Sequence, residues 1–403
     1  MCSVGDDVDE EKAKFMQKKI TLNFTNALCI KCRTLKPQVI LHNQYPYCKA
    51  CFLSGTVHKF KALLGKNRVV QPNESVLIHH KAGHASTALL HFLRTGLDLN
   101  TPKKIRFKPI IAYIEDNYEL NVEDRTHISR QVSDEAERLN FPIVFINLAQ
   151  YVTNKSNLPS IVHEKVEDLR IDPDDNMKIR AAVKSNSTLT TQTEIVHYFE
   201  RELLLKVAKH LGCQCIFTTD LGIDIASQLL KNVTLGRGEN IVYDTGVVDS
   251  RDMDVSVLRP LRNFTIKELA LYNYFNHLEP VSFYRKTKNP YSSMQNLVEK
   301  FLADLHVNYP ATISTIVRTG DKLGVNNEPS EDRCMLCKVP IRKEIESLGS
   351  AEATNFSHWI STQTRSCDKS LKERTSQILA TFDNNKYNKY CYSCNQIAPY
   401  LCQ

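Results

Sequence analysis

Residues 76–90 read VLIHHKAGHASTALL, and this stretch decides the fold. Val76–His80 is a short β-prone run, and Ser86–Arg94 carries three leucines at helical spacing. A strand that turns directly into a helix is typical of βαβ units and a parallel sheet. Because ligands of such sheets bind at the carboxyl ends of the strands, we expect a nucleotide at the turn between His79 and Ser86.

The sequence on either side continues this alternation. Further strands are predicted at Pro109–Ile114, Ile143–Ile146, Cys215–Thr218 and Ile241–Tyr243. Helices are predicted at Arg125–Leu139 and Ile223–Lys231, and where Ile195, Phe199, Leu203, Val207 and Leu211 recur before Gly212. Residues 154–187 are polar and contain two prolines, which predicts an insertion or a mobile loop. After Arg259 the pattern turns helical, with Thr265–Phe275, which Thr265 and Glu268 cap, and Ser292–Val307.

The composition is that of a globular protein with an ordinary core. The chain has 403 residues, of which 42% are hydrophobic and 24% charged. No apolar run approaches the roughly 20 residues that span a bilayer, and the polar, acidic N-terminus resembles neither a secretory signal nor a transit peptide. We therefore expect a cytosolic protein without a membrane partner. A net charge of +7 is compatible with a nucleic-acid partner but does not argue for one alone.

These patterns predict three regions. Residues 1–70 form an N-terminal zinc-ribbon-like segment with a linker, and residues 71–260 form the α/β domain. Residues 261–403 form a helical C-terminal region that carries further cysteine pairs. The expected fold class is therefore α/β, a parallel-sheet domain with a small zinc-binding segment at each terminus.

Eight of the thirteen cysteines fall into four CxxC pairs. In the N-terminal half of this set, fifteen residues separate the pair Cys29–Cys32 from the pair Cys48–Cys51. This spacing is typical of a four-thiolate structural zinc site, in which the intervening residues form a hairpin. The alternatives are four unligated thiols in a loop and a redox dithiol, although exchange chemistry does not need two matched pairs.

The other two pairs, Cys334–Cys337 and Cys391–Cys394, are separated by fifty-three residues. They suggest a second zinc site, because no other use for two such pairs is evident in the sequence. The longer gap leaves two separate surface motifs as the alternative.

Three stretches together resemble a known family. Val76–Leu90 is similar to the strand, phosphate loop and helix of the PP-loop ATP pyrophosphatases (adenine nucleotide alpha hydrolase-like proteins), and Thr219–Ala226 to their second nucleotide-side motif. Arg259–Arg262 (RPLR) and Lys267–Asn273 (KELALYN) resemble a stretch of the tRNA-thiolating branch. With cysteine pairs at both ends, the chain most resembles the cytoplasmic tRNA 2-thiolation protein 2 family, the divergent second subunit of the cytosolic thiouridylase.

The chain departs from this pattern where the chemistry would occur. The family's phosphate loop reads Ser-Gly-Gly-x-Asp-Ser, and its glycines let backbone N–H groups wrap a phosphate. The corresponding residues here are Lys81, Ala82, Gly83, His84, Ala85 and Ser86. In the second motif, the family's usual start, His-Asn-x-Asp-Asp, is degraded to Thr219-Asp220 with Gly222. These changes disfavour ATP binding, and no catalytic residue is assigned.

The sulfur-handling positions of active relatives are also changed. Those relatives carry a CxxC ahead of the helix before the fourth strand and a further cysteine after the RPLR stretch. Ser185–Thr193 and Phe275–Tyr291 contain no cysteine. We therefore expect neither an iron–sulfur cluster nor a sulfur-transfer step on this chain.

Two basic features are candidates for RNA contact. Lys81 and His84 could hold an RNA phosphate at a helix N-terminus, or belong to a drifted loop packed against a partner. The second feature consists of Lys103, Lys104, Arg106 and Lys108, which form either a phosphate-binding stripe or a solvated strand edge.

The resemblance implies a function in tRNA modification. It implies a non-catalytic subunit that pairs with an intact thiouridylase subunit and supports 2-thiolation of the wobble uridine, giving 5-methoxycarbonylmethyl-2-thiouridine. The implied substrates are the tRNAs for lysine, glutamate and glutamine, and the implied sulfur source is a thiocarboxylated ubiquitin-like carrier. The alternatives are an ATP-dependent sulfurtransferase active by itself and a stand-alone zinc-ribbon RNA-binding protein.

Overall fold

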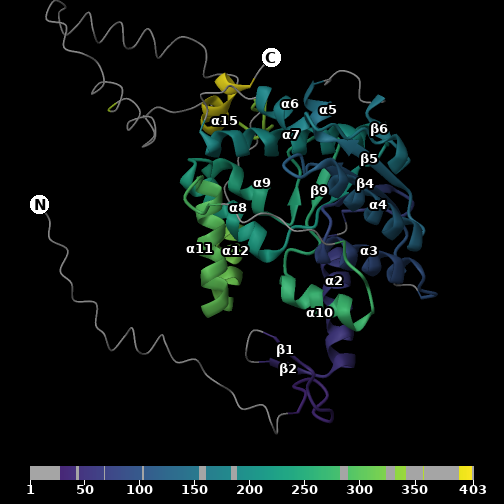
Figure 1. Ribbon diagram of the computed structural model, residues 1–403. Coiled ribbons are helices and arrows are strands. Elements are labelled where there is room, and N and C mark those ends of the chain that lie inside the picture. The colour runs from purple at the N-terminus through teal and green to yellow at the C-terminus, as the bar shows by residue number, and fades with distance from the viewer. Residues whose placement is uncertain are drawn as a thin grey trace, which may run out of the picture. The chain divides into compact units, whose positions relative to one another are not determined.

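The computed structural model describes residues 28–41, 45–67, 69–101, 104–153, 160–182, 188–281, 289–323, 332–341, 357 and 390–401. The chain divides into two compact units, Met1–His58 and Lys59–Gln403. Figure 1 shows the elements of both. Among the described helices, none is long and apolar enough to cross a membrane.

The first unit is built on a small antiparallel hairpin. Strand β1 (Val39–Leu41) pairs with β2 (Tyr45–Tyr47), as the cysteine spacing predicted. Helix α2 (Lys49–Asn67) begins inside the second cysteine pair and continues past the boundary between the two units in the sequence. The first described turn of this helix includes the hydrogen bond from Phe52 N–H to Cys48 O, at 2.9 Å.

The second unit contains a seven-stranded sheet in the order β6-β5-β4-β3-β7-β9-β8. The five inner strands are parallel, and the short edge strands β6 and β8 run antiparallel. The strands are β3 (Ser75–His80), β4 (Lys108–Glu115), β5 (Ile143–Asn147), β6 (Val162–His163), β7 (Cys215–Phe217), β8 (Val248–Asp249) and β9 (Ser256–Leu258). This mostly parallel α/β sheet is the predicted fold class.

Helices cover both faces of this sheet (Figure 1). Successive residues of β4 point to opposite faces. Ala112 and Ile114 pack in the cluster that contains the apolar side of α7, whereas Tyr113 packs with Ile128 and Val132 of α4. The helices are α3 (His84–Leu97), α4 (Val122–Arg138), α5 (Leu148–Thr153), α6 (Asp175–Ala181), α7 (Leu189–His210), α8 (Gly222–Thr234), α9 (Ile241–Thr245), α10 (Ile266–Phe275), α11 (Met294–Asn308), α12 (Pro310–Lys322) and α15 (Tyr392–Ile397).

Two predictions about this unit were wrong. Ile241–Tyr243, predicted as a strand, lies in helix α9, where the Thr245 hydroxyl donates to Ile241 O at 2.7 Å. The fifth parallel strand is β9, which pairs with β7 in the register Cys215↔Ser256. Three β-prone residues are too short a run to outweigh tertiary packing.

Residues 154–187 are also more ordered than predicted, within the part of them that the structure describes. They contain β6 and α6, and Asp175 at the start of α6 is fully buried. Its carboxylate binds Arg125 of α4 at 2.7 Å and Asn147 of β5 at 2.8 Å. A polar sequence therefore folds here through buried charge pairing, which hydrophobic periodicity does not report.

The strand order reverses beside β3. The chain runs from β3 outward through β4 and β5, and then returns to place β7 and β9 on the other side of β3. Loops that follow neighbouring strands on the two sides of such a switch point leave a crevice at the carboxyl edge of the sheet. The loop after β3, residues 81–83, and the loop after β7, residues 218–221, therefore face the same crevice.

Candidate functional site

In the loop between β3 and α3, two backbone N–H groups already donate hydrogen bonds within the chain. The backbone N–H of Lys81 donates to Ser86 Oγ at 3.0 Å, and that of Ala82 donates to His80 Nδ1 at 3.2 Å. Ala82 has φ of 50°, and Gly83 has φ of 100° with ψ of 179°, a conformation that only glycine adopts readily. Ala82 thus sits in the left-handed region, where its Cβ is unfavourable.

This strain makes a testable prediction. Ala82→Gly should leave stability unchanged or raise the free energy of unfolding by up to about 1 kcal/mol, because relief of roughly 1–2 kcal/mol of left-handed strain is partly offset by roughly 0.4–1 kcal/mol of unfolded-chain entropy. Ala85→Gly, in the first turn of α3, is the matched control and should cost roughly 0.5–1 kcal/mol. Urea denaturation of both variants measures the difference. Equal losses in the two variants would contradict the strain.

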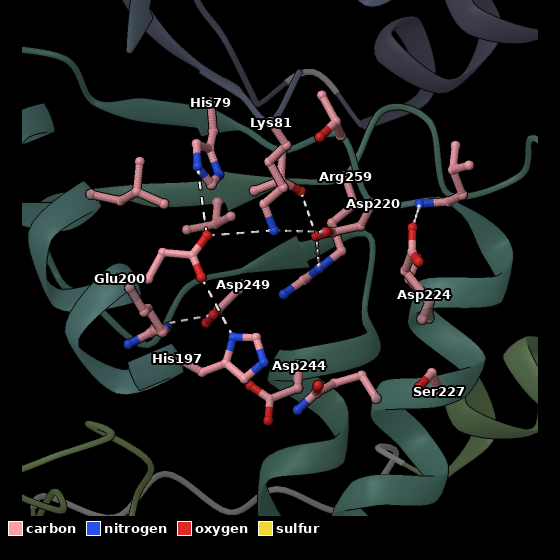
Figure 2. Close-up of a pocket in the computed structure, with 18 of the residues that line it drawn as sticks. His79, Lys81, His197, Glu200, Asp220, Asp224, Ser227, Asp244, Asp249 and Arg259 are labelled. Atoms are coloured by element: carbon pink, nitrogen blue, oxygen red, sulfur yellow. Dashed lines mark hydrogen bonds and ion pairs between the residues drawn. The ribbon is translucent and has the colours of Figure 1, made fainter. Parts of the chain in front are cut away.

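The side chain of Lys81 points into the crevice and lies between two carboxylates (Figure 2). Its Nζ is 3.7 Å from Glu200 Oε1 on α7 and 3.8 Å from Asp220 Oδ1 after β7. Glu200 above all raises the pKa of Lys81, against the opposing effect of desolvation and with help from Asp220. The positive charge of Lys81 is therefore balanced by two carboxylates of the same chain.

The two carboxylates are correspondingly held in their charged form. Burial by itself would raise the pKa of Glu200, but Lys81 and a hydrogen bond from His197 keep that pKa well below its usual range. Burial acts the same way on Asp220, and Lys81, Arg259 and Thr218 together lower its pKa. Thr218 Oγ1 donates to Asp220 at 2.7 Å. These interactions argue against the prediction that Lys81 holds an RNA phosphate, since its charge is already compensated.

His79 lies beside this group without adding charge. Its ring is 3% exposed, and Nε2 is 3.7 Å from Glu200 Oε1. Burial, followed by the nearby Lys81 cation, lowers the pKa of His79 to about 4. The imidazole is therefore neutral at physiological pH.

The crevice has a volume of about 620 Å³, and ion pairs also form its inner wall. Arg251 binds Asp249 through Nη2 at 2.7 Å and also pairs with Asp244, while Arg201 binds Asp249 at 3.1 Å. No cysteine is among the described residues that line the cavity. The site has the space for a ligand, but its charged groups are largely paired with one another and it presents no thiol.

The RPLR and KELALYN stretches hold segments around this crevice in place through hydrogen bonds and ion pairs. Arg259 donates to Gly246 O at 2.8 Å and lies 3.6 Å from Asp220, and Arg262 binds Asp321 of α12 at 2.7 Å. In α10, Asn273 donates to His84 O at 3.0 Å and so holds the start of α3. The capping box of Thr265 and Glu268 is present as predicted. Glu200 and Arg251, by contrast, were missed, because no local pattern marks either.

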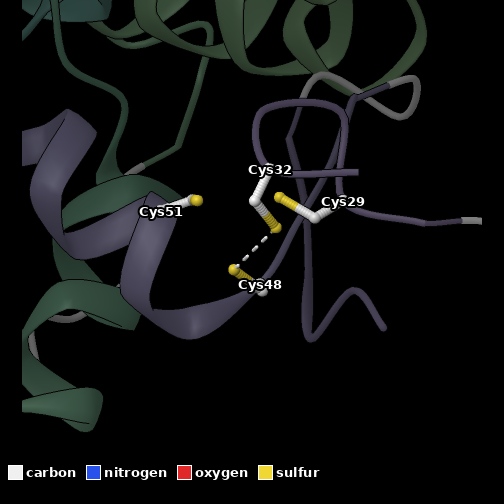
Figure 3. A group of neighbouring side chains, drawn as sticks. All are labelled: Cys29, Cys32, Cys48 and Cys51. Carbon is white, nitrogen blue, oxygen red and sulfur yellow. Dashed lines mark hydrogen bonds between the residues drawn. The ribbon is translucent and has the colours of Figure 1, made fainter. Parts of the chain in front are cut away.

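The N-terminal cysteines converge. The sulfurs of Cys29, Cys32, Cys48 and Cys51 all lie within 4.8 Å of one another, with Cys32 and Cys48 3.9 Å apart (Figure 3). Cys29 and Cys32 form a knuckle in which Arg33 has φ of 56° and its backbone N–H donates to Cys29 O at 2.8 Å. The second pair lies at the start of α2. Four mutually close thiols fit a tetrahedral ion.

The C-terminal cysteines converge in the same way, although fifty-three residues separate the pairs. Lys338 follows the Cys334–Cys337 knuckle with φ of 62°, and its backbone N–H donates to Cys334 O at 3.0 Å. Arg33 has the same conformation and the same hydrogen bond in the first cluster. Cys391 and Cys394 again lie at a helix start, that of α15. All four are buried, so both clusters share one construction, a knuckle plus a helix N-terminus, and each could hold a metal ion.

The basic run lies away from the crevice. Lys103 is outside the described residues, and Lys104, Arg106 and Lys108 are exposed at the amino end of β4. The intervening Phe107 packs edge-on against Phe217, at 5.4 Å between ring centroids. Because the crevice is at the carboxyl edge of the sheet, these three cations do not contribute to it.

The fold and the crevice define an α/β domain with a mostly parallel sheet and a cavity at the carboxyl edge of its strands. In agreement, the structure is similar to the U34-tRNA thiolase NcsA from Methanococcus maripaludis with its 4Fe–4S cluster, with a TM-score of 0.55 and 20% sequence identity. The similarity covers 77% of this chain and 91% of that chain, and it establishes the fold alone.

The sequence comparisons find similar proteins that share one name. The model for cytoplasmic tRNA 2-thiolation protein 2 matches residues 293–396. Cytoplasmic tRNA 2-thiolation protein 2-A from Xenopus laevis is 28% identical over 90% of this chain and 81% of its own length. Cytoplasmic tRNA 2-thiolation protein 2 from Drosophila yakuba is 28% identical over 98% of both chains. These matches confirm the resemblance that the motifs indicated, and the chain is a relative of these proteins.

Proposed function

We propose that this chain is a cytoplasmic, non-catalytic subunit required for 2-thiolation of the wobble uridine in tRNAs for lysine, glutamate and glutamine. It would act as the heterodimeric partner of an active thiouridylase subunit. That partner would take sulfur from a thiocarboxylated ubiquitin-like carrier. The names of the relatives support the thiolation pathway and the cytoplasmic location.

One observation carries the non-catalytic part of the proposal. Lys81 lines the crevice, and its Nζ lies 3.7 Å from the Glu200 carboxylate and 3.8 Å from the Asp220 carboxylate, which balance its charge. An ATP phosphate would have to displace or repel these carboxylates, because like charges destabilise each other at such distances. The backbone donors of Lys81 and Ala82 are also engaged within the chain. The lining cysteines that a sulfur relay would use are absent among the described residues.

The cysteine clusters would have a structural role in this subunit. We propose zinc for both, because closed tetrahedral thiolate sites suit this ion and stabilise small segments outright. Iron is the competing ion, since thiolates also bind it. When bound, the ion would cross-link each knuckle to its helix, and no step of the reaction is assigned to it.

A rescue experiment tests the non-catalytic assignment. Cells that lack the chain should lose wobble 2-thiouridine, and Lys81→Ala should restore it to the wild-type level. The reason is that Lys81 only balances two carboxylates that keep other partners without it. Glu200 lies 3.5 Å from His197, and Asp220 accepts from Thr218 and lies 3.6 Å from Arg259. Mass spectrometry of wobble nucleosides gives the readout, and pulldown from the same cells reports the partner.

The competing functions predict other outcomes. An abundant, partner-bound Lys81→Ala chain that restores no thiolation would favour an active sulfurtransferase, as would ATP–pyrophosphate exchange by the purified chain alone. Intact thiolation after deletion, with no thiouridylase recovered, would favour a stand-alone RNA-binding protein.

A further inference from the structure

The described part of the first unit, which begins at residue 28, lies in a stretch of sequence without any acidic residue. Between Lys12 and Asn73 the sequence contains twelve lysines and arginines and not one aspartate or glutamate. The whole chain has 52 basic and 45 acidic residues, so the remainder is net acidic. The positive charge of the protein is therefore concentrated in one segment, and blocks of like charge of this kind are typical of surfaces that bind polyanions.

Within the described part of this unit, three cations gather on the cysteine knuckle. Lys31 lies between Cys29 and Cys32, Arg33 follows the knuckle, and Lys36 precedes the hairpin, and all three are exposed. The hydrogen bonds from Cys29 N–H to Leu35 O and from Ile30 N–H to Pro46 O, both at 2.9 Å, fix this loop against the hairpin. The cations are thus presented on a rigid support. We call the described residues 29–41 and 45–47 the cationic ribbon.

The ribbon differs from the other basic features of the chain. Lys81 in the crevice is balanced by two carboxylates, and Arg251 beside the C-terminal cluster is balanced by Asp244 and Asp249. Among the described residues, no carboxylate forms an ion pair with Lys31, Arg33 or Lys36, whereas Lys59 of the same stretch pairs with Glu268 at 3.0 Å. Even a tetrathiolate zinc centre, with a net charge of about −2, would leave the acid-free segment strongly positive.

Exposed apolar side chains are interleaved with these cations. Ile30 is 48% exposed, Leu35 55% and the aromatic ring of Tyr45 43%. Cations that track a backbone, beside an aromatic ring on which a base can stack, are the arrangement found in RNA-binding surfaces. An acidic protein is the other polyanion that the charge would attract.

We propose that the cationic ribbon is an RNA-binding surface that contacts the tRNA phosphate backbone through Lys31, Arg33 and Lys36. The inference rests on the proposed function for the identity of the RNA. It assigns the contact to the ribbon that carries the N-terminal cysteines, rather than to Lys81 or to the Lys104 run. The contact carries no sequence preference of its own, because phosphates are the same along the chain.

The test compares two variants that each remove three charges from the full-length, metal-loaded chain. One is Lys31→Gln/Arg33→Gln/Lys36→Gln, and the matched control is Lys104→Gln/Arg106→Gln/Lys108→Gln. Affinity for an unmodified lysine tRNA transcript is measured against NaCl concentration. The ribbon variant should bind about ten-fold or more weakly at 0.1 M salt, and its log–log salt slope should fall by roughly 2–3. The control should keep the wild-type slope.

Metal content and circular dichroism confirm that both variants are folded. A ribbon variant with wild-type affinity and slope would overturn the proposal, as would a loss confined to the control. Loss of the partner subunit with unchanged tRNA affinity would instead make the ribbon a protein-binding surface. If the ribbon variant loses tRNA while deletion of the chain leaves wobble thiolation intact, the inference stands and the proposed function fails.

Discussion

Cys391→Ser is expected to remove one metal ion per chain and to release the C-terminal segment from the α/β domain. Apparent binding free energies of structural zinc are roughly 10–16 kcal/mol, so the loss of one ligand from a closed site is severe. The segment depends on this site, since the described residues 332–341 and 390–401 meet at the four cysteines. Ile397 and Leu401 beside them pack into the main core.

The effect should extend to the wall of the crevice. Arg333, which precedes the knuckle, donates to the backbone oxygen of Arg251 at 3.1 Å, and Tyr243 packs against the cluster. The Arg251 guanidinium lies 5.5 Å from the Tyr243 ring and binds Asp249. Loss of the metal therefore frees two of the groups that contact Arg251, the Arg333 side chain and the Tyr243 ring. Amide hydrogen exchange should show faster exchange in α15 and α9.

The matched control is Cys215→Ser, which alters a buried cysteine of β7 that belongs to neither cluster. Elemental analysis should find two ions per chain in the wild type and in this control, and one in Cys391→Ser. The same analysis identifies the metal. Equal metal content in all three proteins would show that the C-terminal cysteines bind no ion.

The second large effect is expected for Arg125→Leu. The guanidinium is 1% exposed and bridges Glu115 at the end of β4 to Asp175 at the start of α6. Arg125 Nη1 also donates to Asp172 O at 3.0 Å. Removing the cation leaves two buried carboxylates without their counter-charge, and breaking a buried pair in this way costs roughly 3–5 kcal/mol. Urea denaturation measures this loss.

Two further variants isolate the cause. Arg130→Leu changes an exposed arginine on the same helix and should alter stability by no more than about 0.5 kcal/mol. Adding Glu115→Gln and Asp175→Asn to Arg125→Leu should recover part of the loss, because no uncompensated charge then remains. A full-sized loss that the added changes do not reduce would point to packing rather than charge.

Local sequence was enough to predict the framework of the fold. The apolar run of β3, the four-residue periodicity of α7 and the capping box of α10 each report burial or hydrogen bonding within a few residues. The CxxC pairs likewise predicted which cysteines would meet, since ligand spacing is a local property within each knuckle. The prediction failed at Ile241–Tyr243 and, for a mobile loop, in the described residues 160–182, where ion pairs with Arg251 and Arg125 replace the local signal.

At the loop of residues 81–86, the sequence predicts the changed residues, and only the tertiary structure shows which groups they contact. The sequence by itself shows Lys81 and Ala82 at the positions where the family has serine and glycine, and it predicts weaker phosphate binding. It does not show whether the charge of Lys81 is available to a ligand. The answer depends on Glu200 and Asp220, which come from α7 and from the loop after β7. Ion pairing is decided by which side chains the fold brings within a few ångströms, and that distance is set by the topology of the sheet, not by any period in the sequence.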